Sequence, residues 1–439
     1  MALEQTAEVR RLAAALADGA APDLEAWETL LLAAARQGGA GVLAGLLAHW
    51  QQTARARAVR CGCGARMRSR GRRLKQLRTI LGTVPFARAR YVCDQCPHTC
   101  FPEDERLDIR QTTYSPGVRR LMARAGSETD FGQAAADLRC YAGLDLDPRE
   151  IERVSEDVGR QIEAWLAEEQ VQACQPRPPL PASAPPIPKF YVSFDGTGVP
   201  VRRAELVGRR GKQADGSART REAKLGCVFT QTGVDAAGRP QREPNATTYV
   251  GAIESSTCFG WRLYAEAVRR GVERAVQVIV LTDGARYNHT LVSTHFPNAI
   301  HIVDLFHAYE HLSQLAQWRW GPQTKAPAGW REALEAGDIP VLVRRAGRRW
   351  PQTDTAREAL RQGLHYFEEN AVQMRYAWFR RQQLFVGSGV VEAGCRTVIG
   401  QRLKQSGMRW SVRGANAVIA LRCCLMSDRF EDFWAARTT

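Results

Sequence analysis

Apolar residues in the second half of the chain recur in short runs that predict β-strands. The runs lie at 190–196, 224–232, 247–254, 276–284 and 299–306. Helical spacing occurs at 261–270 and dominates the stretch 312–385, which is also rich in Trp and Arg. Three strands followed by an alternation of helix and strand are typical of an α/β domain. We therefore interpret 312–385 as a helical insertion into that domain.

The N-terminal region has helical spacing and is rich in Ala and Leu. Its apolar stretch, residues 30–50, contains Arg36, Gln37, His49 and several glycines. Because a membrane span needs roughly 20 predominantly apolar residues, we interpret this stretch as two short helices of a soluble protein. The first residues also lack a signal-peptide pattern, which predicts a cytoplasmic protein.

Residues 111–173 are predicted to form three short helices. Pro116 begins the first, Asp130 caps the second, and Pro148 begins the third. The third helix has one apolar face, made of Ile151, Val154, Val158, Ile162 and Trp165. Three short helices with tight turns are typical of a helix-turn-helix DNA reader, and equally of any small helical bundle.

A proline-rich segment, residues 174–189, divides the chain into a mainly helical first half and an α/β second half. Six of its prolines fall between Pro176 and Pro186, so it is predicted to be extended and semi-rigid. The fold class is thus a multidomain α/β protein. The predicted segments are a helical lead-in at 1–50, a basic module at 51–110, a helical region at 111–173, the linker at 174–189, a sheet domain at 190–311 and 386–439, and the insertion at 312–385.

Positive charge is concentrated in one segment of the chain. The formal net charge is +15, and the stretch 51–93 has twelve Arg and Lys residues and no Asp or Glu. A chain this basic usually binds a polyanion, although a basic enzyme with a merely solvated surface is the plainer alternative. Basic residues lie here among cysteines and not on an amphipathic helix, which favours DNA over a membrane surface.

Two acids share the same local pattern. Asp195 and Asp283 each end an apolar run and are each followed by glycine. Carboxylates at the ends of neighbouring strands converge on one cleft, where their repulsion requires a cation, and hard oxygen ligands favour Mg²⁺ or Mn²⁺. Glu392 is the third candidate, in a helix that Ser388 is expected to cap. An ordinary first-turn glutamate is its plainer interpretation, and Glu254 and Glu310 are its rivals.

Cysteines form two close pairs around the basic segment. Cys61-x-Cys63 and Cys93-x-x-Cys96 could supply four thiolates to a tetrahedral Zn²⁺, with Cys100 or His98 as replacement ligands. Their separation is acceptable for a zinc ribbon with a hairpin between the two knuckles, so the basic module 51–110 is expected to be zinc-ribbon-like. Reduced cysteines without a metal are the alternative. The six cysteines without such pairing are predicted to fill the core: Cys140, Cys227, Cys258, Cys395, Cys423 and Cys424.

Several motifs, taken together and in order, resemble the ISKra-type family of insertion-sequence DDE transposases. They are CGCG…VCDQC, YSPGVRRLMARAG, DFGQAAADL, VSFDGTGVPV, REAKLGCVFT, LTDGARYN, FPNAIHIVDLFHAYEHL and GSGVVEAGCRTVIGQRLKQSGMRWS, between about residues 60 and 425. The resemblance implies an RNase H-like core and a metal-binding triad of Asp195, Asp283 and Glu392. It also implies a supporting element of Asp304 and His307. The Cys-x-Cys knuckle departs from the usual Cys-x-x-Cys.

The expected function is metal-dependent cleavage and strand transfer of DNA, by a homodimer or higher oligomer that binds transposon ends and target. A nuclease that does not join strands and a catalytically inactive DNA-binding regulator are the alternatives. His307 and His311, four residues apart, give support or form a zinc pair. Trp410 either stacks on an unpaired base or belongs to the core. The residues expected to contact DNA are Arg202, Arg203, Arg209, Arg210, Lys212, Arg402, Lys404 and Arg409.

Overall fold

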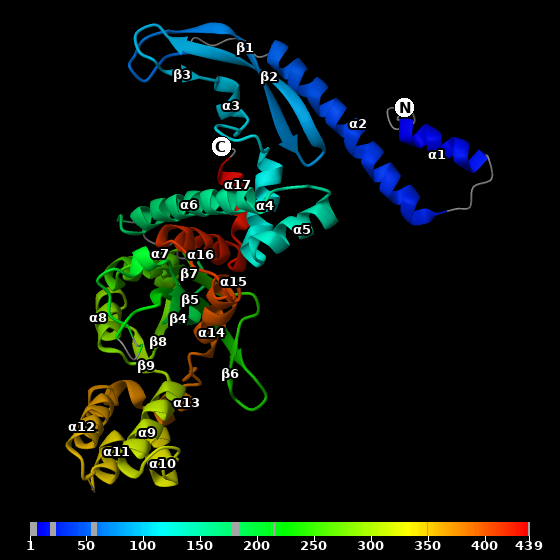
Figure 1. Ribbon diagram of the computed structural model, residues 1–439. Coiled ribbons are helices and arrows are strands. Elements are labelled where there is room, and N and C mark those ends of the chain that lie inside the picture. The colour runs from blue at the N-terminus through cyan, green and yellow to red at the C-terminus, as the bar shows by residue number, and fades with distance from the viewer. Residues whose placement is uncertain are drawn as a thin grey trace. The chain divides into compact units, whose positions relative to one another are not determined.

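The computed structural model describes residues 7–17, 23–53, 59–176, 184–211, 213, 216–348 and 350–437. The chain forms two compact units with a mixed α/β architecture (Figure 1). One unit contains residues 1–126 and 131–154, and the other contains residues 127–130 and 155–439. Each unit has its own β-sheet.

The first unit begins with two helices, α1 (Ala7–Ala17) and α2 (Leu24–Thr53). The prediction of two short helices in 30–50 was wrong, because α2 is one continuous helix. Each internal glycine costs a helix only about 1 kcal/mol, and the surrounding Ala and Leu residues are good helix formers. By length and composition, α2 is also the one helix among the described residues that could cross a membrane, and 6% of its most apolar window is buried.

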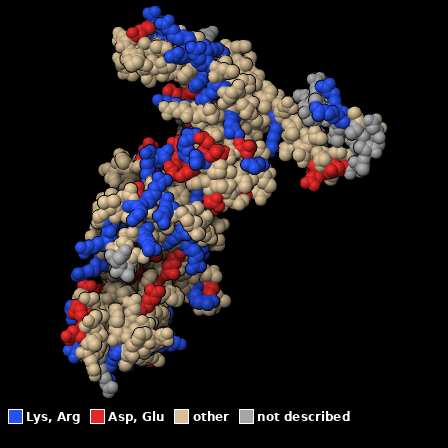
Figure 2. Space-filling model, viewed as in Figure 1, with Lys and Arg blue, Asp and Glu red and all other residues tan. Residues whose placement is uncertain are grey.

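A three-stranded antiparallel sheet follows α2 in the same unit. Its strands are β1 (Met67–Thr79), β2 (Gly82–Cys93) and β3 (Thr99–Cys100), in that order, and α3 (Pro102–Arg106) follows. The hairpin expected between the cysteine pairs is therefore confirmed. The end of α2 covers this sheet, where Leu47 and Trp50 pack against Leu77, Phe86 and Ile109. Figure 2 shows Lys and Arg side chains gathered over β1 and β2.

The three helices predicted for 111–173 are present as α4 (Pro116–Glu128), α5 (Phe131–Ala142) and α6 (Pro148–Ala173). The hydroxyl of Ser115 accepts a hydrogen bond from the amide of Val118 at 3.3 Å, which caps α4. The apolar face predicted for α6 is buried at Ile151, Val154, Val158 and Ile162.

The division between the two units lies inside α6, at residues 154 and 155, and not in the proline-rich segment. The second half of α6 belongs to the later unit because its side chains pack there. Trp165 lies 5.8 Å from Phe433, centroid to centroid, and Glu169 forms an ion pair with Arg429. Residues 177–183 of the predicted linker lie outside the described residues, and the first strand of the large sheet already begins at Ile187.

The second unit is built on a six-stranded mixed sheet. Its strands are β4 (Ile187–Pro200), β5 (Thr220–Val234), β6 (Pro240–Arg242), β7 (Thr248–Ala252), β8 (Ala275–Thr282) and β9 (Ile300–Val303). Their order is β6-β5-β4-β8-β9, and β7 also pairs with β5. The neighbours of β5 are antiparallel to it, whereas β4, β8 and β9 are parallel. The predicted strands are thus confirmed, and the short β6 was missed.

Helices cover both faces of this sheet. Alternate residues of β4 divide between the two faces, with Phe190 and Val192 on one and Tyr191 on the other. The first face packs against α7 (Ser256–Arg269) and α8 (Arg286–His295). The second packs against the predicted helical insertion, which is confirmed as α9 (Leu305–Trp320), α10 (Ala328–Ala336), α11 (Ile339–Ala346), α12 (Asp354–Glu369) and α13 (Tyr376–Arg381).

The chain returns to the sheet after the insertion. A continuous helical segment consists of α14 (Gly389–Gly394), a π-helical turn (Cys395–Gly400) and α15 (Gln401–Leu403). It is followed by α16 (Val412–Met426) and α17 (Phe430–Ala436). Four of the six cysteines predicted to be core are buried. The prediction was wrong for Cys140 and Cys258, which are exposed because they lie on the solvent faces of α5 and α7.

The close packing of α6 on α16 gives a stability prediction. A Cβ added at Gly159 would overlap the backbone carbonyl of Ala417, which has no side-chain freedom with which to move away. We expect Gly159→Ala to lower the free energy of unfolding by about 1–3 kcal/mol, as measured by urea denaturation. Gly233→Ala is the control, because a Cβ there meets nothing within 4 Å. Equal stability of the two variants would contradict this packing.

Candidate active site and metal centre

Strand register places Asp195 and Asp283 side by side. Ser193 of β4 pairs with Leu281 of β8 in the parallel ladder, and each acid follows two residues later. Side chains two residues apart lie on the same face of a sheet, so both carboxylates lie at one height and on one face. This is the face covered by the insertion and by α14, since Tyr191, Leu281 and Val391 share one core cluster.

The two aspartates are held by nearby amides. Asp283 accepts hydrogen bonds through Oδ1 from the side-chain amide of Asn288 at 2.5 Å and from the backbone amide of Ala285 at 3.0 Å. Asp195 accepts one from the backbone amide of Gly196 at 2.6 Å. Burial raises the pKa of Asp195 above its usual range, and the charges of Asp283 and Glu392 raise it further. Asp283 and Glu392 therefore act electrostatically on Asp195.

Glu392 approaches the same face from α14. This helix packs closely on the sheet at Gly394, where an added Cβ would meet Tyr249 at 2.7 Å and Leu225 at 3.0 Å. In the next turn the thiol of Cys395 lies 3.9 Å from Oδ2 of Asp195. That turn is π-helical, a local departure that is frequent at functional sites. Glu392 itself remains exposed to solvent.

Ser388 has a different role from the one predicted. It occupies the position before α14, but its side chain caps no backbone amide. Its hydroxyl donates a hydrogen bond to Oε1 of Glu392 at 2.6 Å instead. The prediction of a helix cap was wrong because the backbone of Ser388, with φ −85° and ψ 11°, is not in the extended conformation of a capping residue. Ser388 consequently orients the third acid.

Asp304, predicted as a supporting residue, is fully buried and joins the segments that carry the acids. Its amide donates to the carbonyl of Thr282 at 2.7 Å, directly before Asp283. Its Oδ1 accepts hydrogen bonds from the amides of Phe306 at 2.5 Å and His307 at 2.9 Å, which caps α9. Its Oδ2 accepts one from the amide of Ser388. One side chain therefore connects the end of β8, the start of α9 and the turn before Glu392.

The two histidines of α9 lie near the acids without forming a metal site. The charge of His307 lowers the pKa of Asp195, but burial raises that pKa by more. Nδ1 of His307 is also 3.5 Å from Glu310. His311 stacks on Tyr366 with a 3.8 Å centroid distance, and the hydroxyl of Tyr366 donates to the carbonyl of Asp283 at 3.1 Å. Both histidines thus have supporting contacts.

Neither rival for the third acid lies in a comparable position. Glu254 forms a two-point ion pair with Arg262, at 2.8 and 3.1 Å. Glu310 is exposed on α9, and its contact is with His307. The charge of Glu392, in contrast, acts directly on Asp195. The strand register therefore sets Asp195 beside Asp283, the charge of Glu392 reaches Asp195, and both rivals are engaged elsewhere.

The oxygen donors of this acid cluster suit a hard divalent cation. Among the described residues, the carboxylates of Asp195, Asp283 and Glu392 do not all lie within 4.8 Å of one another. Their mutual repulsion, which contributes to the raised pKa of Asp195, is what a bound cation would neutralise. Carboxylate oxygens favour Mg²⁺ or Mn²⁺ over softer metals.

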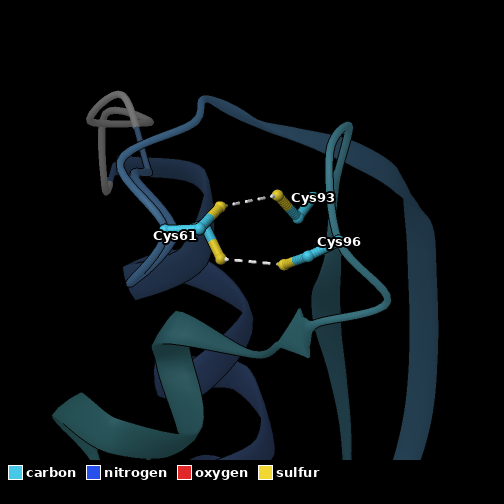
Figure 3. A group of neighbouring side chains, drawn as sticks. Cys61, Cys93 and Cys96 are labelled. Carbon is cyan, nitrogen blue, oxygen red and sulfur yellow. Dashed lines mark hydrogen bonds between the residues drawn. The ribbon is translucent and has the colours of Figure 1, made fainter.

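Four cysteines form the tightest group of possible metal ligands in the described chain (Figure 3). The sulfurs of Cys61, Cys63, Cys93 and Cys96 all lie within 4.8 Å of one another. The Cys61–Cys96 pair is 3.5 Å apart and the Cys63–Cys93 pair 3.6 Å apart. Four ligands about 2.3 Å from a tetrahedral Zn²⁺ would lie roughly 3.8 Å from one another, so the group could bind zinc.

The rest of the local structure favours the same four ligands. The backbone amide of Gln95 donates to Sγ of Cys93 at 3.4 Å and lowers the pKa of that thiol to about 7, whereas the neighbouring thiols raise the pKa of Cys96 to about 12. The first proton is therefore lost most easily from Cys93. A thiolate is the form that binds a metal. The alternative ligands are not part of this group, since neither Cys100 nor His98 is among the side chains that lie within 4.8 Å of one another, and the thiol of Cys100 contacts Met67 instead.

Most of the basic residues expected to contact DNA are exposed. Arg209 and Arg210 line a groove of about 870 Å³ that begins at Gly196, beside Asp195. The sequence pattern missed further cations of this groove, namely Arg219, Arg221 and Lys224. Arg202, Arg203, Lys404 and Arg409 are also exposed, and Lys404 contacts Thr197. Lys212 lies outside the described residues.

The prediction for Arg402 was wrong. Its side chain is fully buried, and its guanidinium lies 5.1 Å from the ring of Trp410. Trp410 is itself buried and donates to the carbonyl of Leu403 at 3.1 Å, so it belongs to the core. The two residues stabilise the segment between α15 and α16, because an aromatic face attracts a buried cation.

No protein family and no curated protein sequence matches this chain. Among solved structures, the Drosophila P element transposase strand transfer complex aligns over 72% of this chain and 80% of that chain. The sequence identity is 8% and the TM-score is 0.20. A likeness this slight does not indicate a shared fold, and the site has to be judged from its own geometry.

The cysteine group gives a prediction about metal content. We expect the purified protein to contain one Zn²⁺ per chain, measured by elemental analysis after gel filtration. Cys61→Ser and Cys93→Ser should each lose the metal, because a tetrahedral site with three thiolates binds much more weakly. Cys100→Ser is the matched control and should keep it. Equal zinc loss in the control would exclude the proposed ligand set.

Asp304 gives a prediction about stability. Asp304→Asn preserves the shape of the side chain but removes its charge and one acceptor, which leaves a buried amide unpaired. We expect a loss of about 2–3 kcal/mol in unfolding free energy. Asp338→Asn is the control, since Asp338 caps α11 from an exposed position. If the Asp304→Asn variant is as stable as this control, the hydrogen bonds of the buried carboxylate do not stabilise the connection between β8, α9 and the turn before Glu392.

Proposed function

We propose that this protein is a DDE transposase, which cuts DNA and joins the cut end to a target with the help of Mg²⁺ or Mn²⁺. The observation that carries the proposal is the strand register that sets Asp195 beside Asp283. The helix that carries Glu392 crosses the same face of the sheet. The electrostatic effect of both acids on Asp195 supports a shared site.

The topology of the large sheet supports an RNase H-like core. Three antiparallel strands in the order β7-β5-β4 are extended by the parallel strands β8 and β9. That is the strand arrangement of an RNase H-like sheet, with β6 as an added edge strand. Asp283 directly follows β8, and Asp195 lies inside β4, two residues beyond the last parallel pair of β4 with β8. Both acids are thus at the carboxyl edge of the parallel β4–β8 pair, where α/β sheets present functional groups.

The residues of the chain would position the reacting groups. Asn288 and Gly196 orient the two aspartates, and Ser388 orients Glu392. Two divalent ions held by these carboxylates would activate the attacking water or 3′-hydroxyl and stabilise the leaving oxygen. Proton transfer would need no side chain of unusual basicity. The main task of the protein would be to hold the attacking oxygen, the phosphorus and the leaving oxygen in line beside the acids.

The basic groove beside Asp195 is suited to the phosphate backbone that leads into the site. Its lining includes five cations and two acids, Glu222 and Glu254, and it reaches Gly196, the residue next to the first acid. Burial lowers the pKa of Arg221, and the charge of Arg209 lowers it further, which shows how closely these cations are crowded. A polyanion would relieve this repulsion. Such contacts make binding steeply dependent on salt.

The first unit is proposed to bind DNA as well. Lys and Arg side chains gather over its β1–β2 hairpin (Figure 2), and α4 and α5 are short helices suited to reading a duplex. Two end sequences must be held at once for strand transfer. We therefore propose double-stranded DNA as partner and a homodimer or larger assembly as the active form.

The test is cleavage and joining of a labelled DNA end from the flanking element. We expect products with Mg²⁺ or Mn²⁺ from the wild type, and a loss of at least about 100-fold in Asp195→Asn, Asp283→Asn and Glu392→Gln, with DNA binding retained. Glu310→Gln is the control and should remain active.

Other results would assign one of the alternative functions. Cleavage without joined products would indicate a nuclease with the same acids. Tight binding without cleavage by the wild type would indicate a DNA-binding regulator. Full activity of Asp283→Asn would show that the triad has been assigned wrongly.

A further inference from the structure

Helix α2 carries a stripe of exposed apolar side chains. Leu24, Leu31, Val42 and Leu46 are 67%, 47%, 58% and 61% exposed, and Ala35 between them is exposed as well. Nothing among the described residues covers this stripe. It is about 33 Å long at the rise of an α-helix. Soluble chains rarely leave so long an apolar face in water unless it meets a partner.

The spacing of the stripe matches a nearly straight helix. Its members follow one another at intervals of seven, four, seven and four residues, which is an eleven-residue repeat. Eleven residues make three turns at 3.67 residues per turn, close to the 3.6 of an unstrained helix. A heptad search therefore misses the pattern, although all five side chains lie along one line of α2.

Small residues occupy the middle of the same helix. A Cβ placed at Gly38, Gly41 or Gly45 would meet nothing within 4 Å, whereas one at Gly39 would meet Leu81 at 3.3 Å, so the backbone is open to a close neighbour on one side of the stripe. The stripe is also close to symmetric about residues 38 and 39. If a second α2 lies antiparallel across this point, Leu31 faces Leu46 of the other copy and Ala35 faces Val42.

We propose that the stripe is the contact surface for a second copy of this chain, paired antiparallel through α2. Large side chains would meet near both ends, and the small residues in the centre would let the helices approach closely. Covering the stripe in two copies removes roughly 1,000 Å² of surface from water, about the minimum for a biological interface and below the roughly 1,200–2,000 Å² of a standard one. The contact is isologous, so it closes at two copies.

A membrane is the competing occupant, and α2 suits it less well. Arg36 lies in the middle of the helix, where a charged side chain costs about 2.5–3.5 kcal/mol in a bilayer. The last turns of α2 are also fixed to the basic sheet, because Trp50 packs there and Gln51 donates to the carbonyl of Ala87. About two turns of the helix are therefore unavailable to lipid.

The proposed contact lies in the first unit and does not rest on the catalytic proposal. Its test is molecular mass in solution, by light scattering on the full chain at about 20 µM. We expect a dimer for the wild type and a monomer for Leu31→Glu or Leu46→Lys. Ala33→Glu is the matched control, because it places the same charge on the opposite, exposed side of α2, and it should remain dimeric.

The double variant Leu31→Glu, Leu46→Lys tests the direction of pairing. In the antiparallel pair the carboxylate introduced at position 31 of one copy would meet the ammonium group introduced at position 46 of the other, so the dimer should return. Parallel pairing sets like charges together and leaves the double variant monomeric, which would overturn the proposal. A wild type that stays monomeric, or dimers that survive Leu31→Glu, would also overturn it. So would flotation of monomeric wild type with vesicles of anionic phospholipid that Leu31→Glu abolishes.

Discussion

The arrangement of the acids depends on the buried carboxylate of Asp304. Its side chain has no exposed surface, and it accepts hydrogen bonds from three backbone amides in two segments. A buried charge is tolerated only when hydrogen bonds replace its water, so all three contacts are needed together. Asp304 also bonds through its own amide to Thr282. The geometry of β8 is thereby transmitted to the turn before Glu392, although Asp304 and Ser388 are 84 residues apart in the sequence.

The chain has two possible metal sites of opposite character. The cysteine group is compact, with sulfur distances that already suit a tetrahedral ion, and its ligands come from two tight turns flanking one hairpin. The acid cluster comes from three separate elements, and its members repel one another. A compact site of soft thiolate ligands holds its ion permanently and stabilises a fold. An open site of hard carboxylate ligands can also bind the oxygens of a phosphate. The first therefore suits a structural ion and the second a reaction.

Local pattern predicted the parts of the site that depend on single strands, and missed those that depend on tertiary contacts. Asp195 and Asp283 were recognisable because each ends an apolar run. Glu392 was chosen only through the family resemblance, since one glutamate in a first helical turn resembles many others. Arg402 was placed on the DNA surface because its burial beside Trp410 depends on a segment eight residues away. The groove cations were missed because β5 brings them to Asp195 only when the sheet forms.

The same distinction explains why α2 was misjudged. Its glycines suggested a break between two helices, because local propensity treats each glycine as a cost. In the folded chain Gly38, Gly41 and Gly45 are open and lie beside a row of exposed apolar residues that includes Leu31, Val42 and Leu46. A helix that retains such residues in water gains nothing from them within one copy. The eleven-residue repeat of these apolar residues gives a straight, self-complementary surface. The glycines, which weaken the helix when it is alone, are the residues that let two copies approach closely in the proposed pair.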